Sequence, residues 1–298
     1  MSRLTKAWRN TRYYRSRIVA RLPKLLVIGG QKCGTSALFQ YLAQHPRLVP
    51  SDEKEVDFFC SDLRYAYGLE WYADHWPRRA PARAIRFEAS PGYLASPRAA
   101  ERIGRWLPDV RIVAILRDPI LRAYSAWQMY RQQLAADPDF YRKHWSTRYS
   151  PEEVAPLVVR TPEELDDFDL AIQREAACLA RGQSMEWSVL ELGLYGPQLQ
   201  VYFDLFRRDQ LLVLDSNDLR TRRVQTLNRV LEFLGQSASD WTNTDLKEVF
   251  VGSWGQPMSQ RAHDYLREYY LPSNQRLGEL LADPPLFVRE PRDYRASA

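Results

Sequence analysis

The sequence predicts a single α/β domain with a central parallel sheet flanked by helices. Apolar runs of strand length at 25–29, 111–116 and 211–214 alternate with patterns of helical periodicity. A glycine-rich turn joins the first run directly to the first helix. Strands that alternate with helices favour a parallel sheet with crossover helices, and ligands bind such sheets outside the carboxyl ends of the strands. With 298 residues, 45% of them hydrophobic, the chain is long enough to bury one large core.

The helical patterns account for most of the remaining chain. They fall at 35–44, 97–106, 119–134, 165–181, 195–207, 221–235 and 259–282. Residues 135–164 interrupt this order, because they are rich in Asp, Pro, Arg and aromatic residues. We expect them to form a long surface excursion on the substrate side of a domain that spans residues 25–298.

Residues 1–24 form a basic segment ahead of the first strand. They contain eight Lys or Arg and no acidic residue, so the net charge of +5 comes from this segment and the rest of the chain is close to neutral. We expect a solvated, flexible leader, with peripheral contact to a membrane surface as the alternative. Three aromatic residues in the segment are too few to stack nucleic acid bases, so we expect no nucleic acid partner.

The apolar and cysteine patterns indicate the compartment. No apolar run approaches the roughly 18–20 residues that a bilayer-spanning helix needs, and no secretory signal is recognisable. Cys33, Cys60 and Cys178 are too widely spaced for a disulfide framework or a metal site. These features favour a soluble cytoplasmic protein in a reducing compartment.

The turn after the first apolar run carries the strongest chemical signal. It reads Gly29-Gly30-Gln31-Lys32-Cys33-Gly34-Thr35-Ser36-Ala37. Its glycines permit close backbone approach, the following helix presents unpaired N–H groups and Lys32 adds a positive charge, so this loop is suited to an anion. A Walker A loop places its lysine directly after the last glycine, whereas Lys32 precedes Gly34 by two residues. The loop is therefore P-loop-like without being a Walker A loop.

Two segments resemble sulfotransferases that use 3′-phosphoadenosine 5′-phosphosulfate (PAPS). The order Gln-Lys-x-Gly-Thr-Ser-Ala-Leu at 31–38 is similar to the 5′-phosphosulfate loop of that family. The run at 110–119 ends in Arg117-Asp118-Pro119, and Ser125 follows eight residues after Arg117. This arrangement is similar to the 3′-phosphate segment of the family.

Two further segments resemble the heparan-sulfate-type branch of the same family. Lys54-Glu55-Val56-Asp57-Phe58-Phe59 resembles its Lys-Glu-x-x-Phe-Phe segment, and the residues at 269–277 resemble its closing helix. The four matches are collinear and extend from about Pro23 to Leu281.

The resemblance implies a role for individual residues. Lys32 and Glu55 would be catalytic: Lys32 stabilises charge on the bridging oxygen of the leaving group, and Glu55 accepts the proton of the acceptor. The donor would be held by Gln31, Lys32, Cys33, Gly34, Thr35, Ser36, Ala37, Arg117 and Ser125. Asp57 and Glu88 are candidate contacts to the acceptor. No metal is required, because Lys32 and the loop amides neutralise the charge.

Two departures from the family pattern bear on the acceptor. Ala89 stands where animal glycan sulfotransferases carry a lysine, and Gly252–Pro257 stands where the family has a basic loop that covers the cofactor. The missing cations favour an acceptor that is less anionic than heparan.

The resemblance predicts a sulfotransferase that moves the sulfuryl group from PAPS to a hydroxyl of a saccharide, glycolipid or small natural product, leaving adenosine 3′,5′-bisphosphate (PAP). The alternatives are N-sulfation of an amine, a non-catalytic nucleotide-binding protein and a P-loop-type phosphotransferase. The position of Lys32 disfavours the phosphotransferase. Golgi members of the family carry a membrane anchor, so the apolar pattern here favours a bacterial, cytoplasmic enzyme of unknown oligomeric state.

Overall fold

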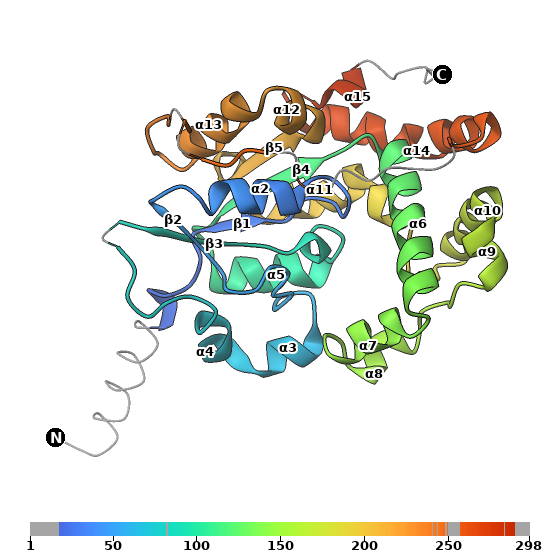
Figure 1. The fold of residues 1–298 in the computed structure, drawn as a ribbon, viewed down its shortest axis with the longest axis horizontal. Helices are drawn as coiled ribbons and strands as arrows, with labels where there is room; N and C mark the ends of the chain where they lie inside the picture. Colours follow the sequence, from blue (N-terminus) through green and yellow to red (C-terminus); the bar gives the residue numbers. More distant parts are fainter. Residues whose placement is uncertain are drawn as a thin grey trace.

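Five parallel strands form one sheet in the order β2-β3-β1-β4-β5 (Figure 1). The structure is a computed structural model that describes residues 18–81, 83–239, 241–242, 244–247, 249, 257–282 and 284–289. The strands are β1 (Leu25–Val27), β2 (Leu48–Pro50), β3 (Ile85–Ala89), β4 (Arg111–Leu116) and β5 (Leu211–Asp215). The predicted α/β class with a central parallel sheet is confirmed.

Two of these strands are absent from the sequence prediction. β2 has three residues and ends at a proline, while β3 alternates Arg86 and Glu88 with apolar residues, so neither forms a continuous apolar run. β3 nevertheless pairs with β1, with Leu26 opposite Glu88 and Val27 opposite Ala89. This pairing places the chain after β3 beside the loop that follows β1.

The helices follow the predicted patterns closely. α5 (Pro97–Trp106) has the predicted bounds, whereas the pattern at 165–181 divides into α9 (Pro162–Asp166) and α10 (Phe168–Ala180) because the side chain of Asp167 caps α10. The pattern at 221–235 corresponds to α13 (Arg223–Phe233), which follows the short separate helix α12 (Ser216–Thr221). The other helices are α2 (Thr35–Leu42), α3 (Asp62–Ala66), α4 (Gly68–Ala73), α6 (Pro119–Ala136), α7 (Phe140–Ser146), α8 (Pro151–Val154), α11 (Tyr195–Leu205), α14 (Gln260–Leu280) and α15 (Leu286–Arg289).

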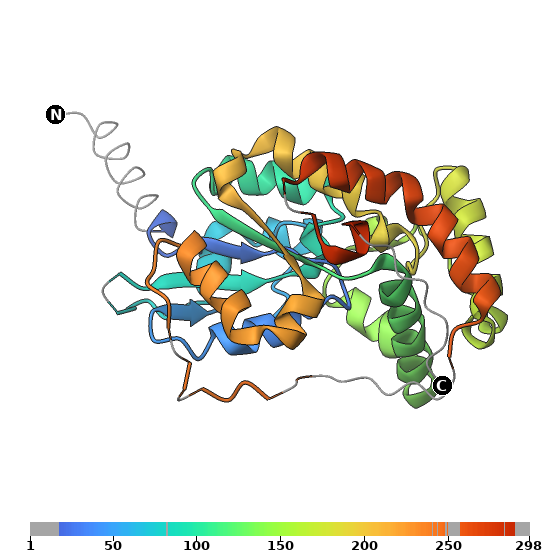
Figure 2. The ribbon, with the colours of Figure 1, turned by 90° about the horizontal axis from the view of Figure 1, so that it is seen from above.

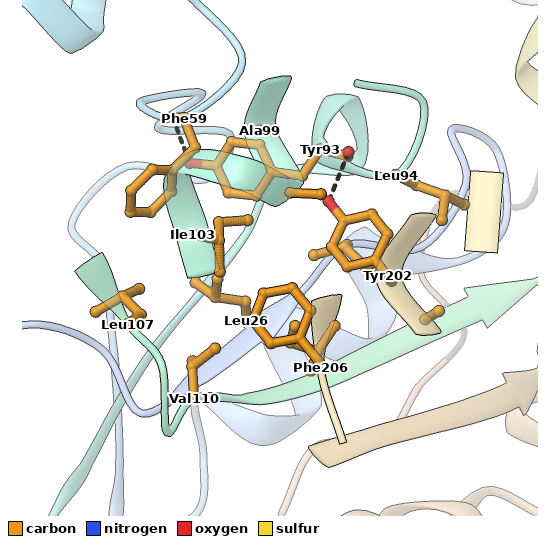
Figure 3. Close-up of a cluster of buried hydrophobic side chains, with 14 of the residues drawn as sticks. Leu26, Phe59, Tyr93, Leu94, Ala99, Ile103, Leu107, Val110, Tyr202 and Phe206 are labelled. Carbon is orange, nitrogen blue, oxygen red and sulfur yellow. Dashed lines mark hydrogen bonds between the residues drawn. The ribbon is translucent and has the colours of Figure 1, made fainter. Parts of the chain in front are cut away.

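Helices cover both faces of the sheet (Figure 2). Leu25 and Val27 of β1 face a core that includes α2 and α13, while Leu26 faces the core built with α5 and α11. Figure 3 shows the second core, in which the hydroxyl of Tyr202 donates to the carbonyl of Tyr93 at 2.7 Å. This bond fixes the turn after β3 to the core beneath the carboxyl edge of the sheet.

The excursion at 135–164 forms short helices instead of an irregular loop. α6 extends into it, and α7 and α8 lie beside α3 (Figure 1). The carboxylate of Glu153 accepts the backbone N–H groups of Asp62 at 2.7 Å and Leu63 at 3.3 Å. Because these are orphan donors at a helix N-terminus, Glu153 attaches the excursion to α3.

The described chain begins at Ile18, ahead of the expected domain boundary at Leu25. Leu22 is 3% exposed in the core, and Nη2 of Arg21 donates to the carbonyl of Ala73 at 2.8 Å. Residues 18–24 therefore pack with the folded body, and residues 1–17 of the basic segment lie outside the described residues. Within the described ranges, no helix has the length and apolar character to cross a membrane.

Candidate active site

The loop between β1 and α2 has the geometry of an anion-binding turn. A Cβ on Gly29 would lie 2.4 Å from the backbone of Ile115 in β4, so only glycine permits this close approach. Lys32 (φ 67°) and Gly34 (φ 93°) both adopt left-handed backbone conformations. No side chain caps α2 at Gly34, which leaves the N–H groups of its first turn for an anion.

The side chains of two loop residues point into the protein. The Gln31 amide oxygen accepts a hydrogen bond from the Tyr130 hydroxyl at 2.9 Å, and the Cys33 sulfur lies 3.3 Å from the Tyr195 hydroxyl. Burial raises the pKa of the Cys33 thiol. These contacts leave the backbone groups of Gln31 and Cys33 for a ligand.

The first turn of α2 supplies the remaining loop residues. Thr35 is buried, while Ser36 and Ala37 are half-buried. They lie at the start of α2, and their binding of a donor stays a prediction.

Three cations gather around the loop. Nη1 of Arg117, at the end of β4, donates to the carbonyl of Lys32 at 3.3 Å, and Arg122 lies behind the loop on α6. Burial lowers the pKa of Lys32, and repulsion from Arg117 and Arg122 lowers it further. Among the described residues, none of the three forms an ion pair with a carboxylate. The region therefore holds an excess of positive charge.

The predicted 3′-phosphate segment starts α6. Asp118 caps this helix by accepting the N–H of Ile120 at 2.9 Å, which leaves Arg117 next to the loop. Ser125 lies about two helical turns further on and is 2% exposed. Joint binding of a phosphate by Arg117 and Ser125 stays a prediction.

The predicted base stands on a strained turn next to the loop. Glu55 (φ 64°) and Asp57 (φ 51°) adopt left-handed conformations, which are uncommon for residues other than glycine and concentrate at functional sites. The N–H of Glu55 donates to the carbonyl of Ala89 at 3.0 Å, and the N–H of Asp57 donates to the Ser90 hydroxyl at 3.1 Å. The end of β3 thus holds this turn beside the end of β1.

Two arginines stabilise the same turn. Nη1 of Arg148 donates to the Glu55 carbonyl at 2.7 Å and to Oδ2 of Asp57 at 2.6 Å. Nη1 of Arg64 donates to the carbonyl of Val56 at 2.6 Å. Because Arg148 lies in the excursion, the excursion supplies a cation that holds this turn.

The carboxylates of the turn have opposite pKa shifts. Burial favours a higher pKa for Glu55, yet attraction to Lys54, Arg148 and His144 outweighs burial and the pKa lies below its usual value. Lys54 forms a close ion pair with Glu55, whose side chain remains 38% exposed. Burial and the charge of Glu55 raise the pKa of Asp57 to about 6, despite its ion pair with Arg148. Glu55 is thus the ionised and accessible carboxylate of the pair.

Glu88 occupies a different position from the one expected of an acceptor contact. It is completely buried, and its carboxylate accepts hydrogen bonds from three hydroxyls. These belong to Tyr72, to Tyr93 at 2.9 Å and to Ser90 at 2.7 Å. Since Ser90 also accepts the N–H of Asp57, the structure places Glu88 beneath the strained turn instead of on the acceptor surface. Burial raises its pKa to about 7.

The buried carboxyl of Glu88 predicts a pH-dependent stability. Its pKa rises from a usual value of 4.5 to about 7 on folding, so the folded state binds more protons in that interval. This stabilisation is complete below about pH 4.5 and is lost as the pH rises through about 7. We expect a higher melting temperature at pH 6 than at pH 8, and a flatter profile in Glu88→Gln. An identical pH slope in the two proteins would contradict this assignment.

The sulfotransferase domain family matches residues 22–260, which include the loop, the strained turn and the arginine after β4. The chain belongs to the sulfotransferase domain family. The predicted enzyme class is thereby confirmed.

The chain is similar to sulfotransferases that are larger proteins. The chain is 30% identical to bifunctional heparan sulfate N-deacetylase/N-sulfotransferase 3 of Homo sapiens over 88% of its own length and 30% of that protein. It is 32% identical to N-deacetylase/N-sulfotransferase 1 of Mus musculus over 79% of its own length and 25% of that protein. It therefore spans less than a third of these curated relatives.

A solved sulfotransferase from Alicyclobacillus acidocaldarius shares the fold. Its TM-score is 0.65 at 24% identity, with 90% of this chain and 99% of that chain covered.

The structure brings the predicted loop, Arg117 and the Glu55 turn to one edge of the sheet. Sequence reasoning missed Arg148 and Arg122 as neighbours of this candidate site. Arg148 has no local signal, because its partners lie 91 and 93 residues away in the chain. Arg122 lies within the segment from Arg117 to Ser125, where its position on a largely apolar helix face was a signal. Gly252–Gln256, part of the expected substitute for the basic loop, lies outside the described residues.

Proposed function

We propose that this chain transfers the sulfuryl group of PAPS to an acceptor hydroxyl, with Glu55 as the base and Lys32 as the electrostatic catalyst. The observation that carries the proposal is the excess of positive charge around an uncapped helix start, next to a strained turn that presents an ionised carboxylate. When bound, PAPS supplies a sulfuryl group attached to a phosphate leaving group.

The loop residues fit a polyanionic donor. The free N–H groups at the start of α2 and the ammonium of Lys32 suit the 5′ end, and the guanidinium of Arg117 suits a second phosphate, with Ser125 as its partner. The family supports PAPS as the donor. Lys32 holds a positive charge where negative charge develops on the bridging oxygen, and its loop keeps it next to Arg117.

Glu55 takes the proton that the acceptor loses as its new bond to sulfur forms. Lys54 keeps the carboxylate ionised, and an acceptor must displace or share this ion pair to reach it. Asp57 lies beside Glu55 and is held by Arg148, so we propose it as a lateral contact for the acceptor.

An amine is the second candidate acceptor, because the relatives at 30–32% identity are named N-sulfotransferases. The same base serves both acceptors, since an amine also loses a proton on sulfation. Two matched oligosaccharides distinguish the candidates in an assay with ³⁵S-labelled PAPS: one carries free amines and the other carries the same amines acetylated. Transfer to both supports a hydroxyl acceptor, and transfer only to the free amine supports N-sulfation.

PAP is expected to bind the free protein and raise its melting temperature without added metal, because a ligand that binds the native state stabilises it. Titration calorimetry in EDTA measures this binding. Arg117→Ala should weaken PAP much more than adenosine 5′-monophosphate, which lacks the 3′-phosphate. No binding of PAP at millimolar concentration would overturn the proposed function.

A further inference from the structure

Arg122 is a buried cation that the proposed reaction does not use. It lies on α6, is completely buried and donates through Nη2 to the carbonyl of Val189. Its Nε and Nη1 atoms have no hydrogen-bond partner among the described residues. Buried charges are normally paired with an opposite charge, so this guanidinium calls for an explanation.

The surroundings of Arg122 place it behind the phosphosulfate loop. Its charge acts on Lys32 and Cys33 of the loop and on the hydroxyls of Tyr130 and Tyr195. Those two tyrosines contact the loop directly, through Gln31 at 2.9 Å and through Cys33 at 3.3 Å. Arg122 thus lies close enough to the loop for its charge to act on Lys32 and Cys33.

The groups that act most strongly on Arg122 are uncharged. The carboxylate of Glu175 accepts the N–H of Val189, whose carbonyl accepts from Arg122, but Glu175 is already paired with Arg160. Tyrosine hydroxyls and a thiol surround it, burial raises the pKa of each of these groups, and each therefore stays protonated. No carboxylate of the described chain pairs with Arg122. A buried cation without a counter-charge destabilises the free protein, and an anion in the adjacent loop is the group placed to offset it.

We propose that Arg122 is a positioning residue of the donor site, whose uncompensated charge strengthens binding of the 5′-phosphate end without touching it. This inference rests on the proposed function, because it requires the loop to hold that end of the nucleotide. It also explains why the free protein keeps three cations together around one loop.

Arg122→Met tests the inference, because it keeps an unbranched apolar stem and removes the charge. Arg122→Lys restores the charge, and Arg131→Met on the same helix is the matched control, since Arg131 is partly exposed and stacks over Trp127. Calorimetric competition measures binding of PAP, adenosine 5′-monophosphate and adenosine 3′-monophosphate. Melting temperatures of the free proteins are measured in parallel.

We expect Arg122→Met to weaken PAP and the 5′-monophosphate roughly tenfold, because charges at buried sites interact with an effective dielectric of about 20. The 3′-monophosphate should change much less, which is the opposite of the pattern expected for Arg117→Ala. The free Arg122→Met protein should melt at the wild-type temperature or above. Arg122→Lys should recover most of the affinity, and Arg131→Met should bind as the wild type does.

Two results would overturn the inference. One is an equal loss for both monophosphates together with a lower melting temperature, which indicates a purely structural arginine. The other is wild-type affinity in Arg122→Met. If the wild-type protein binds none of the three nucleotides, the proposed function itself is overturned. That result is seen without any variant, so it differs from the two results above.

Discussion

Replacement of Lys32 by Ala is expected to lower both kcat and the affinity for PAP. Lys32 lies three residues before the first residue of α2, and its left-handed conformation fixes where its side chain begins. Removal of one preorganised group that stabilises transition-state charge commonly costs about 10²–10³ in kcat. Because Lys32 also contacts the bound donor in our proposal, the Kd for PAP should rise as well.

The matched control for Lys32 is Lys247→Ala, since the side chain of Lys247 is 87% exposed and its backbone contacts Tyr41 in the last turn of α2, at the other end of the helix from the loop. Single-turnover kinetics with labelled PAPS and titration with PAP separate the two effects. Lys32→Ala with wild-type kcat and weaker binding would restrict Lys32 to donor binding. The lowered pKa of Lys32 adds a pH test: activity should fall at a lower alkaline pH in the wild type than in Lys32→Arg.

The loop and its turn geometry were predictable because they are local. Two glycines, a lysine and a helix start are contiguous in sequence, so the anion-binding turn follows from neighbouring residues. The parallel sheet followed equally from its apolar runs, β4 above all. β3 was missed because its polar residues break the apolar run, and one of them, Glu88, is buried only because three hydroxyls satisfy it.

The acceptor side was not predictable to the same extent. Arg148 binds the carbonyl of Glu55 across 93 residues, and nothing within the excursion marks it. Arg122 lies on a largely apolar helix face, but it breaks the general rule that buried charges are paired, so its burial was not predicted. Both residues depend on contacts between segments that only the fold brings together.

Glu55→Gln is expected to lower kcat by roughly 10²–10⁴ while the Kd for PAP stays within a few-fold, because the variant loses a general base and keeps the loop. The structure favours this variant as a clean test. Arg148 and Arg64 hold the backbone carbonyl of Glu55 and not its carboxylate, so the strained turn keeps its anchors when the side chain becomes an amide. The side chain of Glu55 is partly exposed, so its neutralisation leaves no new buried charge.

Glu53→Gln provides the control for Glu55, since Glu53 lies in the same cluster and contacts the same two arginines at 3.4–3.5 Å. It should keep most of the wild-type kcat, because Glu53 neither lies on the strained turn nor pairs with Lys54. A Glu55→Gln enzyme with near wild-type turnover would eliminate Glu55 as the base. Asp57→Asn would then be the next variant, because Asp57 is the neighbouring carboxylate whose raised pKa of about 6 suits proton transfer near neutral pH.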